Sequence, residues 1–170
     1  MPNEELTERV LRLLEQARYV SLATTSSQGS PWVSVLEYAW FARPLRLVFG
    51  SPAQSLHSRH IAERLQVAGA LFTAGGGPEL DVDAIDGAQF SGRCRELSGE
   101  DLLAHHRPYY EKLFSEEEER ARWMLPSSSL RHPAAHRLYL IEVDRLWLVD
   151  TRTWEEDRVE RRVEVPLTGL

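Results

Sequence analysis

The spacing of apolar residues near the N-terminus predicts a helix over residues 3–18. One face of this helix would carry Leu6, Val10, Leu11, Leu14 and Ala17. Asn3 is a suitable N-cap, and Glu4 and Glu5 would lie at the positive end of the helix dipole. From Tyr19 onward the apolar period changes from about 3.6 to 2, which is the period of a strand.

Short strands separated by turns dominate the rest of the chain. The pattern predicts strands over 19–25, 32–41, 45–49, 66–73, 80–97, 136–143 and 146–150. Because the first three follow one another through short loops, we expect an antiparallel meander rather than a parallel sheet. Gly87 and Gly92 interrupt the long extended segment, which indicates bulges or close approaches of the backbone.

Two helical segments are predicted between these strands. Near residue 50 a strand ends and a helix begins: Ser51 can cap it, Pro52 suits its first position, and Gln54 completes a capping box. Ser55 is a second possible cap, which would start the helix one turn later. A longer helical excursion is expected over about residues 98–124, beginning at Ser98 and Gly99.

Composition places the chain among globular proteins and excludes several other classes. With 170 residues, 42% hydrophobic and 27% charged, we expect one domain over 1–170 and neither a disordered nor a membrane-spanning chain. The single cysteine, Cys94, and the lack of signal-peptide features favour a cytoplasmic protein. The net charge of −6 argues against a nucleic-acid partner but is compatible with a local pocket for a small anion.

The reactive residue types do not form a known catalytic motif. The histidines at 105, 106, 132 and 136 lack an HExxH pattern, so we expect structural or surface roles and no metal site. Cys94 is more typical of a buried strand cysteine than of a reactive thiol. No Ser/His/Asp arrangement, Walker loop or GxGxxG motif is present, so nucleophilic and nucleotide-triphosphate chemistry are not supported.

Several stretches together resemble a known family. They are YVSLATTSSQGSPWVSVLEYAW, LRLVFGSPAQSLHSRHI, QVAGALFT, GAQFSGRCRELSGED and HRLYLIEVDRLWLVD, spanning residues 19–150. Their order is similar to the pyridoxamine 5′-phosphate oxidase-like, FMN-binding split-barrel superfamily, and in part to a poorly characterised bacterial branch of it. The resemblance implies a mainly β fold with added helices, built on a six-stranded antiparallel split β-barrel. It also implies an FMN-binding oxidoreductase that forms a homodimer.

The resemblance further implies a flavin phosphate where the third strand meets the short helix. It places Ser51 and Ser55 at hydroxyl positions that bind phosphate, and His57 where the family usually has lysine, with Arg59 nearby. It places Ser34, Val35 and Leu36 beside the flavin ring. Unpaired N–H groups at a helix start suit an anion. No catalytic acid, base or nucleophile is expected, because the flavin carries the chemistry.

Two positions depart from the best-known members of the family. Ser34 and Ala39 stand where those members carry arginine and lysine, and this loss would lower FMN affinity unless another residue compensates. An alternative therefore stays open, namely a non-enzymatic dimeric split-barrel protein that binds haem, a deazaflavin or a protein partner. In that case Ser51 is only a helix cap, and His57 and Arg59 belong to a solvated helix face.

Overall fold

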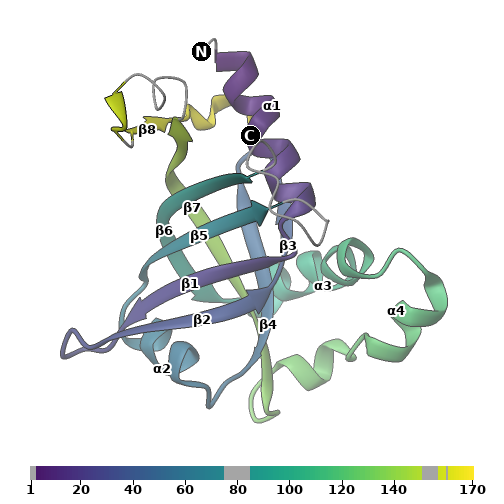
Figure 1. Cartoon of the computed structure of the whole chain (residues 1–170). Helices are drawn as coiled ribbons and strands as arrows, with labels where there is room; N and C mark the ends of the chain where they lie inside the picture. Colours follow the sequence, from purple (N-terminus) through teal and green to yellow (C-terminus); the bar gives the residue numbers. More distant parts are fainter. Residues whose placement is uncertain (1–2, 75–84, 151–156, 160) are drawn as a thin grey trace.

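A computed structural model describes residues 3–74, 85–150, 157–159 and 161–170 (Figure 1). Its helices are α1 (Asn3–Gln16), α2 (Leu56–Glu63), α3 (Gly99–Leu113) and α4 (Glu117–Trp123), with short 3-10 turns η2 (Ser127–Leu130) and η3 (Leu167–Gly169). Its strands are β1 (Tyr19–Thr25), β2 (Pro31–Glu37), β3 (Ala39–Phe41), β4 (Arg46–Pro52), β5 (Gln66–Ala74), β6 (Ile85–Glu96), β7 (His136–Asp150) and β8 (Arg161–Glu164).

The strands form one antiparallel sheet that curls into a split barrel. The order is β2-β1-β5-β6-β7-β4-β3, with β8 paired to β7. β2 and β3 lie at opposite ends of this order, yet a single residue, Tyr38, separates them in sequence. The chain therefore brings the two ends of the sheet together, and the barrel is split between β2 and the β3–β4 pair (Figure 1). The antiparallel split-barrel prediction is confirmed.

The strand boundaries differ from the prediction at three places. The expected strand over 32–41 breaks at Tyr38, and the two closing strands are one continuous β7. β8 is added, so the described residues hold eight strands where six were expected. Residues 80–84, also predicted as extended, lie outside the described residues.

The two glycines predicted to interrupt the long strand do so. A register shift falls between Ser91 and Gly92, and a Cβ at Gly92 would overlap the carbonyl oxygen of Glu142 on β7. A Cβ at Gly87 would come within 3.3 Å of the carbonyl oxygen of Leu71. Neighbouring backbone therefore passes too close to Gly92 for a side chain, which explains the bulge.

The barrel interior and α1 form the main core. The apolar face of α1, with Leu6, Val10 and Leu14, packs against strand residues such as Val20 and Leu22. The helix ends at Gln16, two residues earlier than predicted, because β1 begins at Tyr19. At the border of this apolar face, Arg9 forms an ion pair with Asp86 of β6 at 2.6 Å.

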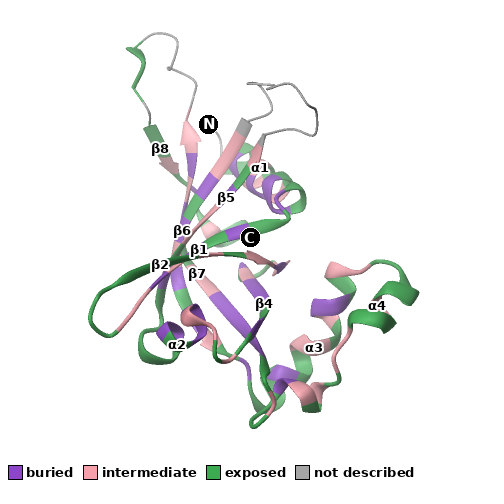
Figure 2. Cartoon of the chain, turned by 60° about the horizontal axis from the view of Figure 1, so that its bottom comes forward, coloured by how far each residue is buried: buried purple, intermediate pink, exposed green. Residues whose placement is uncertain are grey.

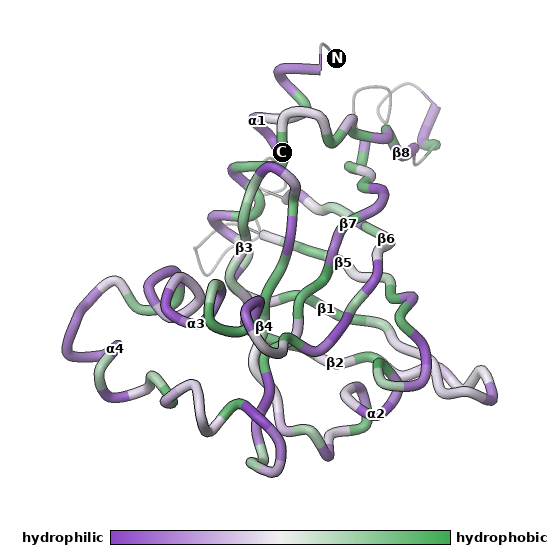
Figure 3. Tube along the Cα trace, turned by 180° about the vertical axis from the view of Figure 1, so that it is seen from behind, coloured by the Kyte–Doolittle hydropathy of each residue, from purple (hydrophilic) through white to green (hydrophobic). Residues whose placement is uncertain are grey.

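The helical excursion forms a second core outside the barrel. Leu102, Tyr109 and Tyr110 of α3 pack with Leu138 and Leu140 of β7. α4 buries none of its residues and is mostly exposed (Figure 2). Hydrophobic residues concentrate along the barrel strands, whereas α4 is largely hydrophilic (Figure 3). In the described part of the chain, no helix is both long and apolar enough to span a membrane.

Candidate functional site

Buried polar side chains meet where β4 ends and α2 begins. On the inward face of β4, Ser51 follows Leu47 and Phe49 and is itself buried. β4 continues through Pro52, so α2 begins only at Leu56 and Ser55 is its N-cap, accepting a hydrogen bond from the backbone N–H of Ser58. The later of the two predicted helix starts is thus correct, and Pro52 belongs to the strand rather than to the helix.

His57 is the centre of this cluster. Its Nε2 lies 2.7 Å from Ser51 Oγ and 3.0 Å from Ser55 Oγ. Its Nδ1 lies 2.9 Å from Ser34 Oγ on β2. The ring is 7% exposed and also packs edge-on against Phe49. Both ring nitrogens therefore have hydroxyl partners, which can donate to or accept from either tautomer.

The surroundings of His57 favour the neutral imidazole. Burial lowers its pKa from the ordinary value of 6.5, and the nearby His60 lowers it further. Removing a cation from water disfavours the charged form, and a second imidazole adds repulsion. In this structure His57 is therefore a neutral hydrogen-bonding group and not a fixed positive charge.

The cluster continues into a network across the end of the barrel. Ser55 donates to Ser58 Oγ at 2.8 Å, and the Ser58 hydroxyl is hydrogen-bonded to Tyr139 of β7. His60 Nδ1 lies 3.2 Å from Thr24 Oγ1 on β1. Among the described residues, no buried side-chain nitrogen or oxygen lacks a partner. The network thus joins α2 to strands of the barrel at the site itself.

The predicted site residues divide into two groups. Ser51, Ser55 and His57, predicted as one group, lie together, and Ser34, predicted beside the flavin ring, joins them through Nδ1 of His57. Arg59 is exposed and is not among the hydrogen-bond partners of the cluster. Because side chains alternate along a strand, Val35 points outward with 69% of its surface exposed, whereas Leu36 packs against the core.

The backbone of β2 offers a second kind of contact. β2 is the last strand of the sheet order and pairs only with β1 within the described residues. The other edge of such a strand carries backbone N–H and C=O groups that are free to bind a partner. This free edge of β2 includes residues 34–36 and begins at the hydroxyl cluster. Its backbone N–H and C=O groups could form hydrogen bonds with a planar ring.

The donors present suit a phosphate monoester. Two serine hydroxyls and an imidazole meet beside the N-terminus of α2, and an α-helix N-terminus favours an anion. Glu37, the nearest acid on β2, pairs with Arg18 at 2.8 Å. The acid that could repel a phosphate is therefore neutralised, and the residues fit the phosphate of FMN.

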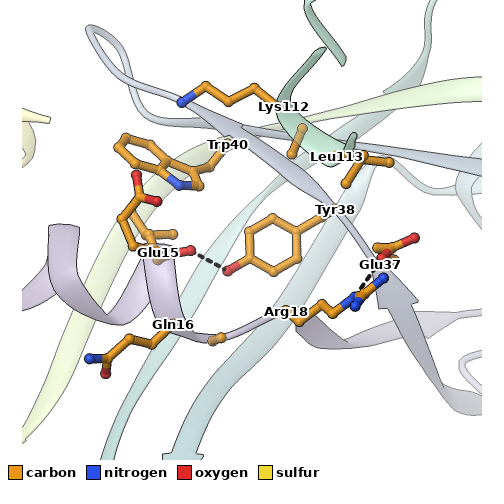
Figure 4. A pocket seen from close by; sticks show the side chains of 11 residues that line it. Glu15, Gln16, Arg18, Glu37, Tyr38, Trp40, Lys112 and Leu113 are labelled. Carbon is orange, nitrogen blue, oxygen red and sulfur yellow. Dashed lines mark hydrogen bonds and ion pairs between the residues drawn. The ribbon is translucent and has the colours of Figure 1, made fainter. Parts of the chain in front are cut away.

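A separate hollow of about 390 Å³ lies at the ends of α1 and α3. Figure 4 shows Tyr38 at its centre, its hydroxyl donating to the carbonyl oxygen of Leu14 at 3.4 Å. Lys112 Nζ lies 4.4 Å from the centre of the Trp40 ring, and Arg18 pairs with Glu37. The charged side chains Lys112, Arg18 and Glu37 on its wall therefore already have partners within the chain.

The outer face of the sheet carries a shallow apolar hollow of about 570 Å³. It is lined mainly by small residues of β1, β5 and β6, including Ala23, Ala68 and Ala70. Three large hydrophobic residues also stay exposed on strands of this part of the sheet, Val33 and Val35 on β2 and Phe72 on β5. Exposed apolar surface of this kind is typical of a protein interface.

A comparison with protein families decides the relationship. The family model of pyridoxamine 5′-phosphate oxidase matches residues 6–150. The chain belongs to the pyridoxamine 5′-phosphate oxidase family. The match includes β1 to β7 and therefore the whole hydroxyl cluster, and it confirms the resemblance predicted from the sequence.

Solved structures with the same fold include proteins with different ligands. A haem-binding protein of Mycobacterium smegmatis superposes with a TM-score of 0.64 at 15% identity, over 96% of this chain and 58% of that protein. An FMN-binding, pyridoxamine 5′-phosphate oxidase-related protein of Nostoc punctiforme gives 0.63 at 12% identity, over 98% and 97%. The haem storage protein HutZ of Vibrio cholerae gives 0.59 at 14% identity, over 83% and 92%. At these identities the likeness establishes the fold.

One curated relative is similar in sequence. The UPF0306 protein of Pasteurella multocida is 27% identical over 90 residues, which are 53% of this chain and 57% of that protein. The match therefore spans little more than half of either chain.

Proposed function

We propose that this member of the pyridoxamine 5′-phosphate oxidase family is an FMN-binding oxidoreductase that holds the flavin phosphate at Ser51, Ser55 and His57. One observation carries the proposal: the two serine hydroxyls converge on His57 Nε2, at 2.7 and 3.0 Å, beside the N-terminus of α2. These are the donors that a phosphate oxygen needs, gathered where the helix dipole favours negative charge.

Each residue of the cluster has a distinct part in this proposal. The hydroxyls of Ser51 and Ser55, now 3.3 Å apart, turn from one another to donate to phosphate oxygens. Ser34 holds Nδ1 of His57 and so keeps Nε2 directed at the same point. A phosphate partner stabilises the imidazolium, so binding raises the pKa that burial had lowered.

The redox chemistry of the proposed enzyme comes from the bound flavin, which accepts or donates a hydride. The chain's part is to bind and orient. The free edge of β2 at residues 34–36 supplies backbone hydrogen bonds to the ring edge, while the phosphate contacts fix its position along the barrel split. No side chain of this chain is required as an acid or base.

A homodimer belongs to the same proposal. The small and apolar residues of the outer sheet face, with Val33, Val35 and Phe72 exposed, suit a second copy of the chain. We expect an interface of more than about 1,200 Å² in total, as stable assemblies bury. A monomer at micromolar concentration in light scattering would contradict this part.

Haem is the competing ligand, because two of the solved structures described above bind or store haem. An axial histidine needs a ring nitrogen with a free lone pair. The cluster could give an iron atom one ligand, a nitrogen of His57, whereas a phosphate can accept hydrogen bonds from both serine hydroxyls and from the imidazole N–H, so the cluster fits a phosphate better.

Titration of the apo-protein with FMN, followed by flavin fluorescence, tests the proposal. Ser55→Ala should weaken binding, and His57→Glu should weaken it more, by at least about tenfold, because it adds repulsion as well as removing a donor. Ser128→Ala and His132→Glu make the same changes in the exposed segment after α4 and should have no effect. Unchanged affinity in both cluster variants would overturn the phosphate site.

A further inference from the structure

The proposed phosphate site lacks an obvious positive charge. A phosphate monoester carries up to two negative charges, but burial keeps His57 neutral and Arg59 is exposed. Ser34 and Ala39 replace the two cationic residues expected at these positions from the family resemblance. Among the described residues that are buried, however, there is one arginine, Arg137, with 5% of its surface exposed.

The sheet register sets Arg137 directly beside the site. In the antiparallel pairing of β4 with β7, Ser51 is the Cα partner of Arg137, and Phe49 is the partner of Tyr139. Directly opposed residues have their side chains on the same face, with Cβ atoms about 5 Å apart. Phe49 and Tyr139 stack at 5.2 Å on the inward face, so Arg137 and Ser51 form the next pair of the same row.

The guanidinium is held in place but has one free end. Nε pairs with Glu96 at 2.9 Å, and Nη1 donates to the carbonyl oxygens of Ala134 and His136 at 2.6 and 2.7 Å. Within the part of the chain that the structure describes, Nη2 has no hydrogen-bond partner, and because no buried side-chain nitrogen there lacks one, Nη2 reaches solvent. Three contacts thus fix the side chain, which lowers the entropy lost when Nη2 binds.

Arg137 also acts on the network of the site. Burial raises the pKa of Tyr139 most, the hydrogen bond from Ser58 lowers it, and the two members of the Arg137–Glu96 pair act on it in opposite directions, the carboxylate raising it and the guanidinium lowering it. The Tyr139 hydroxyl is hydrogen-bonded to Ser58, and Ser58 accepts from Ser55. Arg137 is therefore coupled electrostatically to Tyr139, which is joined to the hydroxyl chain that would bind the phosphate.

We infer that Arg137 is the cation that balances the ligand's phosphate, donating from Nη2 beside the Ser51 hydroxyl. The inference rests on the proposed function, since it takes the phosphate to lie at this cluster. Its partner Glu96 is 47% exposed and can remain paired through Nε while the other side of the guanidinium binds. An arginine in a buried site binds phosphate more strongly than the exposed Arg59 could.

A comparison of FMN with riboflavin, which lacks the phosphate, tests the inference. The wild-type protein should bind FMN more tightly than riboflavin. Arg137→Gln should reduce FMN affinity by about 10-fold to 100-fold and leave riboflavin affinity unchanged, because a charge-assisted hydrogen bond is lost. Arg145→Gln removes an exposed arginine of the same strand and should change neither.

Two further variants guard against a purely structural effect. Arg137→Lys keeps the charge and should retain more FMN affinity than Arg137→Gln, at equal helix and sheet content by circular dichroism. Glu96→Gln removes the competing carboxylate and should leave FMN affinity unchanged or higher.

The outcomes separate this inference from the proposed function. If wild-type protein prefers FMN and Arg137→Gln keeps that preference, Arg137 is only structural and the inference is wrong while the phosphate site stands. If wild-type protein binds FMN and riboflavin equally, or binds neither, the phosphate site itself is wrong and the inference falls with it.

Discussion

Gly69, in the barrel interior, has no room for a side chain because an aromatic ring lies against it. Gly69 of β5 faces Phe90 of β6, and the Phe90 ring, 2% exposed, lies across it. A Cβ at Gly69 would come within 2.5 Å of Cε1 of that ring, whereas ordinary contacts begin near 3.4 Å. Gly69→Ala therefore forces the ring out of a packed core, which costs about 1–3 kcal/mol.

The net effect of Gly69→Ala is smaller than the clash alone. An alanine restricts the unfolded chain and returns about 0.4–1 kcal/mol. The variant should therefore be destabilised by about 1–2 kcal/mol, and its Tm should fall by about 2–8 °C for a domain of this size. Gly169→Ala is the matched control, since its Cβ would meet Thr7 at an ordinary 3.5 Å and should change stability by less than about 0.5 kcal/mol.

A double-mutant cycle identifies the cause of the loss. In a Phe90→Leu background the ring is gone, so Gly69→Ala should cost less than about 0.5 kcal/mol in thermal or urea unfolding. Equal destabilisation by Gly69→Ala in both backgrounds would refute the contact with Phe90 as the reason for the glycine.

Three other outcomes are expected. Gly92→Ala should lower Tm more than Gly69→Ala, because its Cβ would overlap backbone of β7 that cannot turn away; an equal or smaller loss would contradict the close approach. Cys94 is buried, which raises the pKa of its thiol, so a thiol reagent should label it only after unfolding, and fast labelling of native protein would contradict its burial. The free energy of unfolding should fall as pH falls below about 6.5, because folding lowers the pKa of His57 and the unfolded chain then binds more protons. His57→Gln should make the free energy of urea unfolding depend less on pH, and an unchanged pH dependence would contradict this reasoning.

Much of the fold could be predicted from the sequence because local patterns were consistent. The helical period before Tyr19, the period of two after it and the glycines at 87 and 92 all correspond to features of the structure. The break at Tyr38 could not be predicted, because it arises where the chain passes from one end of the sheet to the other. This crossing follows from the way the split barrel brings the two ends of its sheet together, and no turn-forming residue marks it in the sequence.

The candidate site was only partly predictable for a similar reason. Ser51, Ser55 and His57 are close in sequence, so the helix-start pattern found them together. Arg137 and Tyr139 come to the site through the pairing of β4 with β7, more than eighty residues later. In the sequence, Arg137 and Tyr139 are marked only as two polar residues on the same face of a long apolar strand. Which residues they lie beside can be stated only when the strand register is known.

The chromophore of the purified protein tests the central proposal most directly. Protein isolated from cells grown with adequate flavin and iron should be yellow, and the pigment released by denaturation should be FMN in equimolar amount. A colourless protein that gains no flavin on incubation with FMN, or a protein that carries haem in place of flavin, would contradict the proposal that this split barrel binds FMN.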